Sequence, residues 1–263
     1  MLEHPRDDAR AIFVPEGQDL VPTVFAVGPW RSDAVHGAAL AALFAAALDR
    51  PDMDVTRLTV DLAAAVRLTP LRLELQDLGG GRRVARRSAV LHDGERTVAR
   101  AQALYVTPQS TALPEPVDPP TSAAPPPSPL VPLPESRAGW PGFESLAMAL
   151  HTQRGEDVAF EGWFQLLVPA IAGEPTSGLQ NALAAADYSS AGTAVMLSLE
   201  KWSFMSLDLT VNLTRRAAGD WVGLRADKSM LGDRGVGVAA SMLHDENGAF
   251  GHCTQTQLVQ RIA

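Results

Sequence analysis

The stretch "GAALAALFAAAL", residues 37–48, constrains the fold more than any other part of the chain. It holds only apolar and small residues, and it ends at "DRPD". We therefore expect a helix over residues 34–49. Such a helix is too short to cross a bilayer, which takes about 20 apolar residues. A helix that is apolar on nearly every side must be wrapped by other elements, and a curled antiparallel sheet is the natural wrapping.

A second unit of the same kind follows later in the chain. In each unit a short extended stretch, near 23–27 or over 158–169, leads to a helix, over 34–49 or 177–190. Four strand-like runs follow each helix, at 55–68, 71–78, 83–93 and 96–106 in the first unit and at 204–216, 220–230, 236–248 and 249–260 in the second. The string "LHD" recurs at 91–93 and 243–245, and "VDL" at 60–62 matches "LDL" at 207–209. A tandem α+β repeat explains these matches better than chance does. Pairing the edge strands of the two units into one sheet would remove two exposed edges.

Prolines mark the boundary between the two units. Residues 107–134 contain 11 of the 20 prolines, a density that forbids a helix or a central strand and favours an extended polyproline segment. We expect an N-terminal domain over residues 1–106, a linker over 107–136 and a C-terminal domain over 137–263.

Composition excludes several function classes. The net charge is −8 and the pI is about 5.2, which argues against nucleic acid as a partner. The single cysteine, Cys253, excludes an internal disulfide and suits a reducing cytoplasm. The first residues, "MLEHPRDDARAIF", do not have the pattern of a signal or transit peptide, and the six histidines show no metal-ligand spacing. We expect a cytoplasmic protein without a membrane span, a metal or a cofactor.

One carboxylate stands out at the end of the second predicted helix. Asp187 closes the alanine-rich run in "LQNALAAADYSSAG", residues 179–192. An acid on the buried side of a helix is costly unless it is paired or used. Asp187 is therefore a candidate general base, and the plain alternative is that it only closes its helix.

Five stretches together resemble a known family. They are "VHGAALAALFAAAL" (35–48), "LGGGRRVARRSAVLHDGERTVARAQALYV" (78–106), "LAAADYSSAG" (183–192), "WSFMSLDLTVNLTRR" (202–216) and "ENGAFGHCTQTQLVQ" (246–260). In this order they resemble the two central helices and the following strands of the double-hotdog acyl-CoA thioesterases of the thioesterase II type. The resemblance implies a tandem hotdog, in which each half wraps a long helix in a curled antiparallel sheet. It also implies an acyl-CoA substrate, no cofactor, and a homodimer or higher homo-oligomer.

The resemblance also implies a catalytic triad. The family's aspartate falls on Asp187, its glutamine on Gln255 and its hydroxyl residue, usually a threonine, on Ser206. Asp187 would activate water with a pKa raised by burial, while Ser206 and Gln255 would hold that water in line. At most one such site is expected, because the first unit has Ala103 in place of Gln255 and His36 roughly where the second unit has Asp187.

Other residues would bind the substrate. Backbone N–H groups at the start of the first helix would stabilise the oxyanion, and they belong to His36, Gly37 and Ala38. Surface arginines would bind the phosphates of the coenzyme, and the candidates are Arg31, Arg82, Arg83, Arg215 and Arg216.

Alternatives remain open for most of these residues. Gln255 and Ser206 lie on polar strands, where solvated side chains are common, and His36 has the position of a structural helix-start residue. The arginine pairs are also typical of solvated strand ends, and Cys253 is expected to be a small buried thiol. Two other functions compete with thioester hydrolysis: a hotdog dehydratase or hydratase that uses His36, and a non-catalytic acyl-CoA-binding module.

Overall fold

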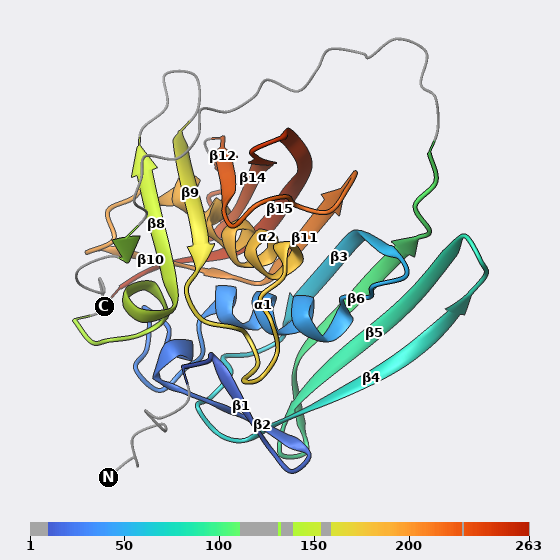
Figure 1. Ribbon diagram of the computed structural model, residues 1–263. Coiled ribbons are helices and arrows are strands. Elements are labelled where there is room, and N and C mark those ends of the chain that lie inside the picture. Colours follow the sequence, from blue (N-terminus) through green and yellow to red (C-terminus); the bar gives the residue numbers. More distant parts are fainter. Residues whose placement is uncertain (1–9, 111–130, 133–138, 154–158, 228, 263) are drawn as a thin grey trace.

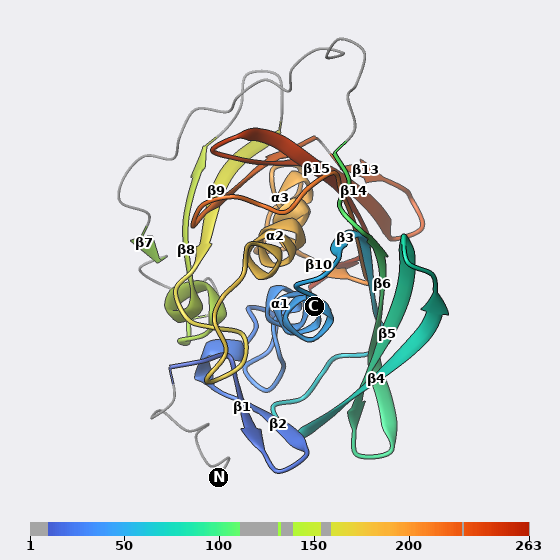
Figure 2. The same ribbon diagram turned by 45° about the vertical axis from the view of Figure 1, so that its right-hand side comes forward.

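A large, strongly curled antiparallel sheet surrounds two helices (Figure 1, Figure 2). The computed structural model describes residues 10–110, 131–132, 139–153, 159–227 and 229–262. Among these residues the sheet has 15 strands, of which 13 follow the order β1-β2-β4-β5-β6-β3-β11-β15-β14-β12-β9-β8-β7, while β10 pairs with β15 and β13 with β14. The curled sheet around apolar helices that the sequence predicts is confirmed.

From its helix onward the first unit follows the predicted order of elements, although the run expected over 55–68 forms a strand only as far as Leu62, and the hairpin of β1 and β2 was not predicted. Its strands are β1 (Phe13–Glu16), β2 (Asp19–Pro22), β3 (Asp54–Leu62), β4 (Leu71–Gly80), β5 (Val84–Asp93) and β6 (Arg96–Val106), and its helix is α1 (Gly37–Leu48). The prediction of an extended stretch near 23–27 is wrong. Residues Val24–Ala26 form a 3-10 turn, η1, because the side chain of Thr23 accepts a hydrogen bond from the N–H of Phe25 and caps the turn.

The second unit repeats this order with more irregular elements. Its strands are β7 (Val131–Pro132), β8 (Met148–Gln153), β9 (Phe160–Leu166), β10 (Trp202–Ser206), β11 (Asp208–Leu213), β12 (Val222–Ala226), β13 (Met230–Leu231), β14 (Val236–Asp245) and β15 (Gly248–Arg261). Its helical elements are η2 (Phe143–Ala147), α2 (Gly178–Asp187), η3 (Tyr188–Ser190) and α3 (Ala191–Ala194). The run predicted over 204–216 is two strands, because the carboxylate of Asp208 accepts a hydrogen bond from the N–H of Thr256 at 2.6 Å and replaces a strand-to-strand bond.

The two units share one sheet. Strand β3 of the first unit pairs antiparallel with β11 of the second, and Asp61 lies opposite Asp208 at one end of the ladder. The predicted pairing of edge strands is therefore confirmed. It also brings α1 and α2 side by side in the hollow of the sheet (Figure 2).

Matching irregularities reveal the internal repeat. The β5–β6 pair has a register shift between Leu91 and His92, and the β14–β15 pair has one between Leu243 and His244. The aspartate that ends each "LHD" string, Asp93 or Asp245, accepts two hydrogen bonds from one arginine. The recurring strings thus occupy equivalent places, and an offset of 152 residues relates Leu91 to Leu243.

This equivalence corrects one prediction. His36 does not correspond to Asp187, because His36 caps the start of α1 while Asp187 is the last residue of α2. The counterpart of His36 is Ser177, which caps the start of α2. His36 and Asp187 nevertheless lie close together, because the first turn of α1 contacts the end of α2.

Burial explains why α1 is apolar on every side. Nine of its twelve residues are buried, and the sheet, α2 and the turns around them provide the contacts. Most of the predicted linker lies outside the described residues, except for Thr107–Ser110 and for Val131–Pro132, which form the edge strand β7. In the part of the chain that the structure describes, no helix is long and apolar enough to cross a membrane.

Candidate active site

The candidate site lies where the first turn of α1 meets the last residue of α2. A Cβ atom added at Gly37 would lie 2.9 Å from both carboxylate oxygens of Asp187. Glycine at position 37 makes this approach possible, because a side chain there would force the carboxylate to shift. The junction joins the two units, since α1 belongs to the first and α2 to the second.

Asp187 is a buried acid with specific partners. The residue is 7% exposed, and its Oδ1 accepts hydrogen bonds from Ser206 Oγ at 3.2 Å and from Gln255 Nε2 at 3.0 Å. Burial raises the pKa of Asp187, although the nearby His36 and these two hydrogen bonds act in the opposite direction. A carboxyl group with a raised pKa is a better proton acceptor near neutral pH than an exposed one.

Strands bring the two partners to Asp187. Ser206 ends β10 and Gln255 lies in β15, and these strands are paired with each other. Gln255 Nε2 also donates to Ser206 Oγ at 2.7 Å. The acid, hydroxyl and amide predicted from the sequence therefore meet at one place.

His36 joins this group from the other side. Its Nδ1 accepts a hydrogen bond from the N–H of Ala38 at 2.9 Å and lies 3.7 Å from Asp187 Oδ2. A neutral ring with an acceptor at Nδ1 carries its proton on Nε2, and this atom lies 3.9 Å from Glu144 Oε1. The ring packs against Phe143 and Tyr188, with centroid distances of 4.8 and 5.9 Å.

Sequence reasoning missed Glu144. This buried acid lies in the single π-helical turn η2, directly after a residue that packs on His36. A five-residue turn has no periodicity that a sequence pattern would reveal. The only signal in "GFESLAM" is a single acid in a largely apolar stretch.

The N–H groups of the three predicted oxyanion donors differ in whether they already donate a hydrogen bond. The N–H of His36 donates to Ala26 O at 2.8 Å, and the N–H of Ala38 donates to the ring of His36. Among the described hydrogen bonds none uses the N–H of Gly37, which stands at the positive end of a twelve-residue helix. Gly37 is thus the available donor of the three.

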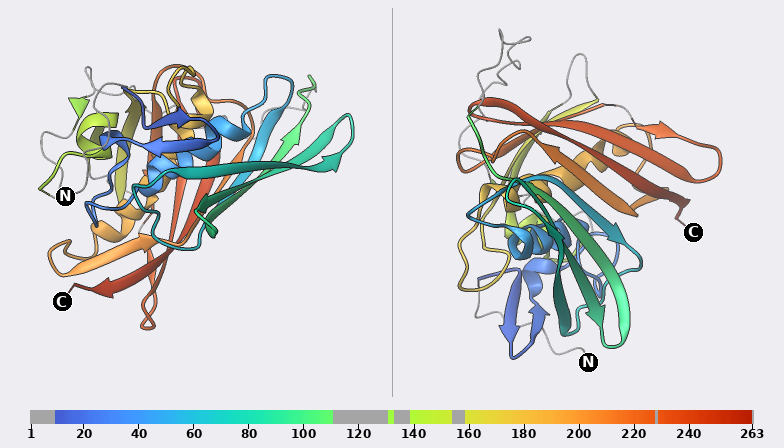
Figure 3. Two further views of the ribbon diagram at one scale, coloured as in Figure 1. Left: turned by 90° about the horizontal axis from the view of Figure 1, so that it is seen from below. Right: turned by 90° about the vertical axis from the view of Figure 1, so that its right-hand side faces the viewer.

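The arginines proposed for phosphate binding lie in three different places. Arg31 precedes α1 and pairs with Asp33 at 2.7 Å. Arg82 and Arg83 are exposed on the β4–β5 hairpin, which extends beyond the helices (Figure 3), and Arg82 lines an open groove there.

Arg215 and Arg216 are engaged elsewhere, which corrects their assignment as phosphate ligands. Arg215 pairs with Asp245 at 2.5 Å, and Arg216 pairs with Asp49 at 2.9 Å and with Asp54 at 2.7 Å. Both guanidinium groups are thus occupied by carboxylates of the chain itself.

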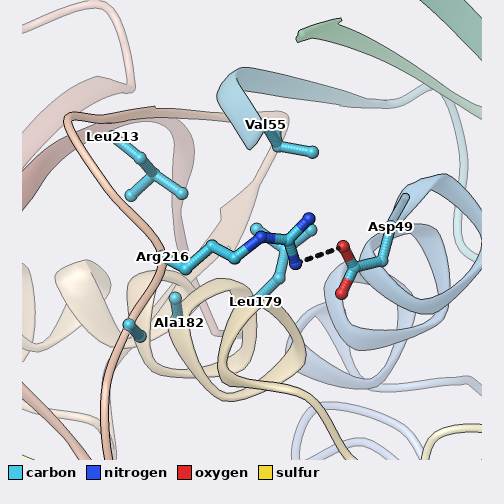
Figure 4. Close-up of a pocket in the computed structure, with 7 residues that line it drawn as sticks. Asp49, Val55, Leu179, Ala182, Leu213 and Arg216 are labelled. Carbon is cyan, nitrogen blue, oxygen red and sulfur yellow. Dashed lines mark hydrogen bonds and ion pairs between the residues drawn. The ribbon is translucent and has the colours of Figure 1, made fainter. Parts of the chain in front are cut away.

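Arg216 lies at the opposite end of the helix pair, where the end of α1 meets the start of α2 (Figure 4). It reaches over Leu179 to Asp49, and its Nε and Nη atoms also contact Asp54 and the carbonyl groups of Arg50 and Met53. Ala103 occupies the position equivalent to Gln255 near this end. The second junction therefore lacks the amide of the first.

Sequence comparison identifies the family. The profile of the acyl-CoA thioesterase N-terminal domain matches residues 26–106, and that of the acyl-CoA thioesterase C-terminal domain matches residues 108–259. These two matches identify the chain as a thioester hydrolase. The chain belongs to the acyl-CoA thioesterase family. None of the curated protein sequences matches it significantly.

Solved structures have the same fold at low identity. A thioesterase II candidate from Thermobifida fusca YX is 16% identical, with 99% of this chain and 100% of that chain covered and a TM-score of 0.72. The acyl-CoA thioesterase II TesB2 from Mycobacterium marinum is 17% identical, with 87% and 89% covered and a TM-score of 0.62. A protein with a hotdog fold from Alicyclobacillus acidocaldarius is also 17% identical, with 98% and 97% covered and a TM-score of 0.63.

Proposed function

We propose that the chain hydrolyses acyl-CoA thioesters with water activated by Asp187. One observation carries this proposal: a buried acid, a hydroxyl and an amide converge beside Gly37, the first residue of α1. Hydrolysis needs a base for the water and a donor for the oxyanion, and this junction supplies both.

The proposed reaction has two steps. Water attacks the thioester carbonyl carbon while Asp187 takes one of its protons, and the carbonyl oxygen becomes an oxyanion that the N–H of Gly37 stabilises. The tetrahedral intermediate then collapses, the carbon–sulfur bond breaks, and the proton held by Asp187 passes to the leaving thiolate. The products are the free acid and coenzyme A. Gln255 and Ser206 hold the carboxylate in place, and the oxygen of Ser206 can also accept a hydrogen bond from the water.

We further propose that the fold is a double hotdog with one active site. The shared register shifts, the paired edge strands and the two wrapped helices support the tandem assignment. The second junction, where Arg216 contacts Asp49, would be inactive. Arg82 and Arg83 remain candidates for the phosphates of the coenzyme, whereas Arg31, like Arg215 and Arg216, is already paired with a carboxylate of the chain.

One observation favours a second candidate function. His36 lies between Asp187 and Glu144, as a histidine that moves a proton in a dehydratase or hydratase would. In that case His36→Ala abolishes activity while Asp187→Asn is tolerated. Thioester hydrolysis predicts that Asp187→Asn is the damaging change.

The test is thiol release from a panel of acyl-CoAs of different length, measured for wild type and Asp187→Asn. We expect a loss of roughly 100-fold or more, the size of general-base catalysis. Asp49→Asn is the matched control, because Asp49 follows the end of the other helix and its described ion pair, with Arg216, lies at the opposite junction. Turnover by the wild type that Asp187→Asn leaves unchanged would refute the assignment, and a folded wild type that releases no thiol would favour a binding module.

A further inference from the structure

A chain of buried polar side chains continues from Gln255 away from the site. Successive inward-facing residues of a strand are two apart, so Gln257 lies beside Gln255 on the same face of β15. Gln257 Nε2 donates to Gln255 Oε1 at 3.0 Å. Beyond it, Gln257 Oε1 accepts from Thr193 Oγ1 at 2.5 Å, and Thr193 Oγ1 lies 2.7 Å from Ser229 Oγ.

Asp187, the last acceptor in this series of side chains, sets the direction of every hydrogen bond in it. An ionised Asp187 only accepts, so Gln255 must turn its NH₂ group toward it. The carbonyl oxygen of Gln255 then needs a donor, which only the NH₂ group of Gln257 supplies among the described contacts. The carbonyl oxygen of Gln257 in turn takes the hydroxyl proton of Thr193, which leaves Ser229 as the donor to Thr193.

We propose that Ser229, Thr193 and Gln257 form a donor chain that holds the amide of Gln255 in the one orientation that serves Asp187 and Ser206. Gln257 is thus a positioning residue for the reaction. The inference rests on the proposed function of Asp187.

Burial supports this role. Gln255, Gln257, Thr193 and Ser229 are all buried, with Gln257 and Thr193 fully so. A buried amide group without a hydrogen-bond partner costs free energy. Any rearrangement of this fully hydrogen-bonded series would leave such a group unpaired, so few alternative arrangements exist. In the first unit the position equivalent to Gln257 is Tyr105, whose hydroxyl donates to Leu48 O at 2.7 Å. The donor chain is therefore confined to the unit that holds Asp187.

The test compares Gln257→Leu, Thr193→Val and Thr193→Ser with wild type. We expect Gln257→Leu and Thr193→Val to lower kcat roughly 10- to 100-fold with KM nearly unchanged, because a misplaced group near the reacting atoms costs up to about 100-fold. Thr193→Ser keeps the hydroxyl and should retain most of the activity. Tyr105→Phe is the matched control, since it also removes one buried hydrogen bond but leaves Gln255 untouched, so its kcat should stay at the wild-type value.

A second readout does not depend on activity. Titration of the Asp187 carboxyl carbon by NMR should show a higher pKa in Gln257→Leu than in wild type, because the amide of Gln255 no longer points reliably at the carboxylate. An unchanged titration together with an unchanged kcat would overturn the inference, as would an equal loss of kcat in Tyr105→Phe. If wild type releases no thiol, the proposed function fails, while the titration still decides whether the donor chain orients Gln255. If Gln257→Leu does not fold, the Thr193 pair of variants carries the test.

Discussion

His244 is the titratable group whose burial gives the sharpest prediction outside the site. It is 2% exposed, and neither ring nitrogen has a hydrogen-bond partner among the described residues. Its ring covers Gly223 on the neighbouring strand, where an added Cβ would overlap the ring, and it packs edge-on against Trp221. Burial lowers the pKa of His244 from 6.5 to about 4, while the charges of Glu161, Arg225 and Asp245 have smaller effects of mixed sign.

The sign of the resulting pH dependence follows from these two values. Above pH 6.5 the ring is neutral in both the folded and the unfolded chain, so it contributes no pH dependence. As the pH falls below 6.5 the unfolded chain binds the proton first, and the free energy of unfolding decreases until about pH 4, where the folded chain binds it too. The loss is about 2 kcal/mol at about pH 5 and about 3 kcal/mol over the whole interval.

Urea unfolding near pH 7 and near pH 5 measures this effect in wild type and in His244→Phe, which keeps an aromatic ring. We expect the variant to lose about 2 kcal/mol less than wild type over this interval. His92→Phe is the control, because His92 holds the equivalent position in the first unit but is partly exposed and faces Glu74. Equal pH dependence in wild type and His244→Phe would show that burial of this ring does not control its protonation.

Three further substitutions test the site and its surroundings. Gly37→Ala should lower kcat/KM roughly 100-fold, because the added methyl group displaces Asp187 and the oxyanion donor. Circular dichroism checks that the variant is folded, and wild-type kinetics would exclude Gly37 from the reaction. Glu144→Gln should lower kcat/KM roughly 10-fold, because the ring of His36, which lies 3.7 Å from Asp187 Oδ2, loses the charged group beside Nε2. Kinetics like those of wild type would make Glu144 purely structural. Arg216→Met should lower the free energy of unfolding by about 1–2 kcal/mol, since several hydrogen bonds at the end of α1 are lost. Thiol release should not change, and a large loss of activity would show that the second junction takes part in the reaction.

Periodicity predicted most of the fold. The fully apolar run of α1 required wrapping, and alternating strands with turn residues between them supplied it. The failures have local causes. The turn at Val24–Ala26 depends on the side chain of Thr23, and the break between β10 and β11 depends on the carboxylate of Asp208. Both are side-chain to backbone hydrogen bonds, which a pattern of apolar residues does not reveal.

The candidate site was less accessible to sequence reasoning. Asp187 attracts attention as an acid at the end of an apolar helix, but Ser206 and Gln255 could be selected only through the family resemblance. The engagement of Arg215 and Arg216 is invisible in the sequence, because Asp245 and Asp49 are 30 and 167 residues away from them along the chain. Glu144 and Gln257 gain their meaning only from the residues they contact in space.

The junction between β3 and β11 has a thermodynamic consequence. The donor at Gly37 comes from one unit and the carboxylate at Asp187 from the other, so a ligand that contacts both binds only when the two units are docked. Such a ligand must strengthen the cohesion of the units by the same free energy by which docking strengthens its binding. Weakening the β3–β11 ladder should therefore weaken the binding of such a ligand as soon as undocked units become populated, without any change at the residues that touch the substrate.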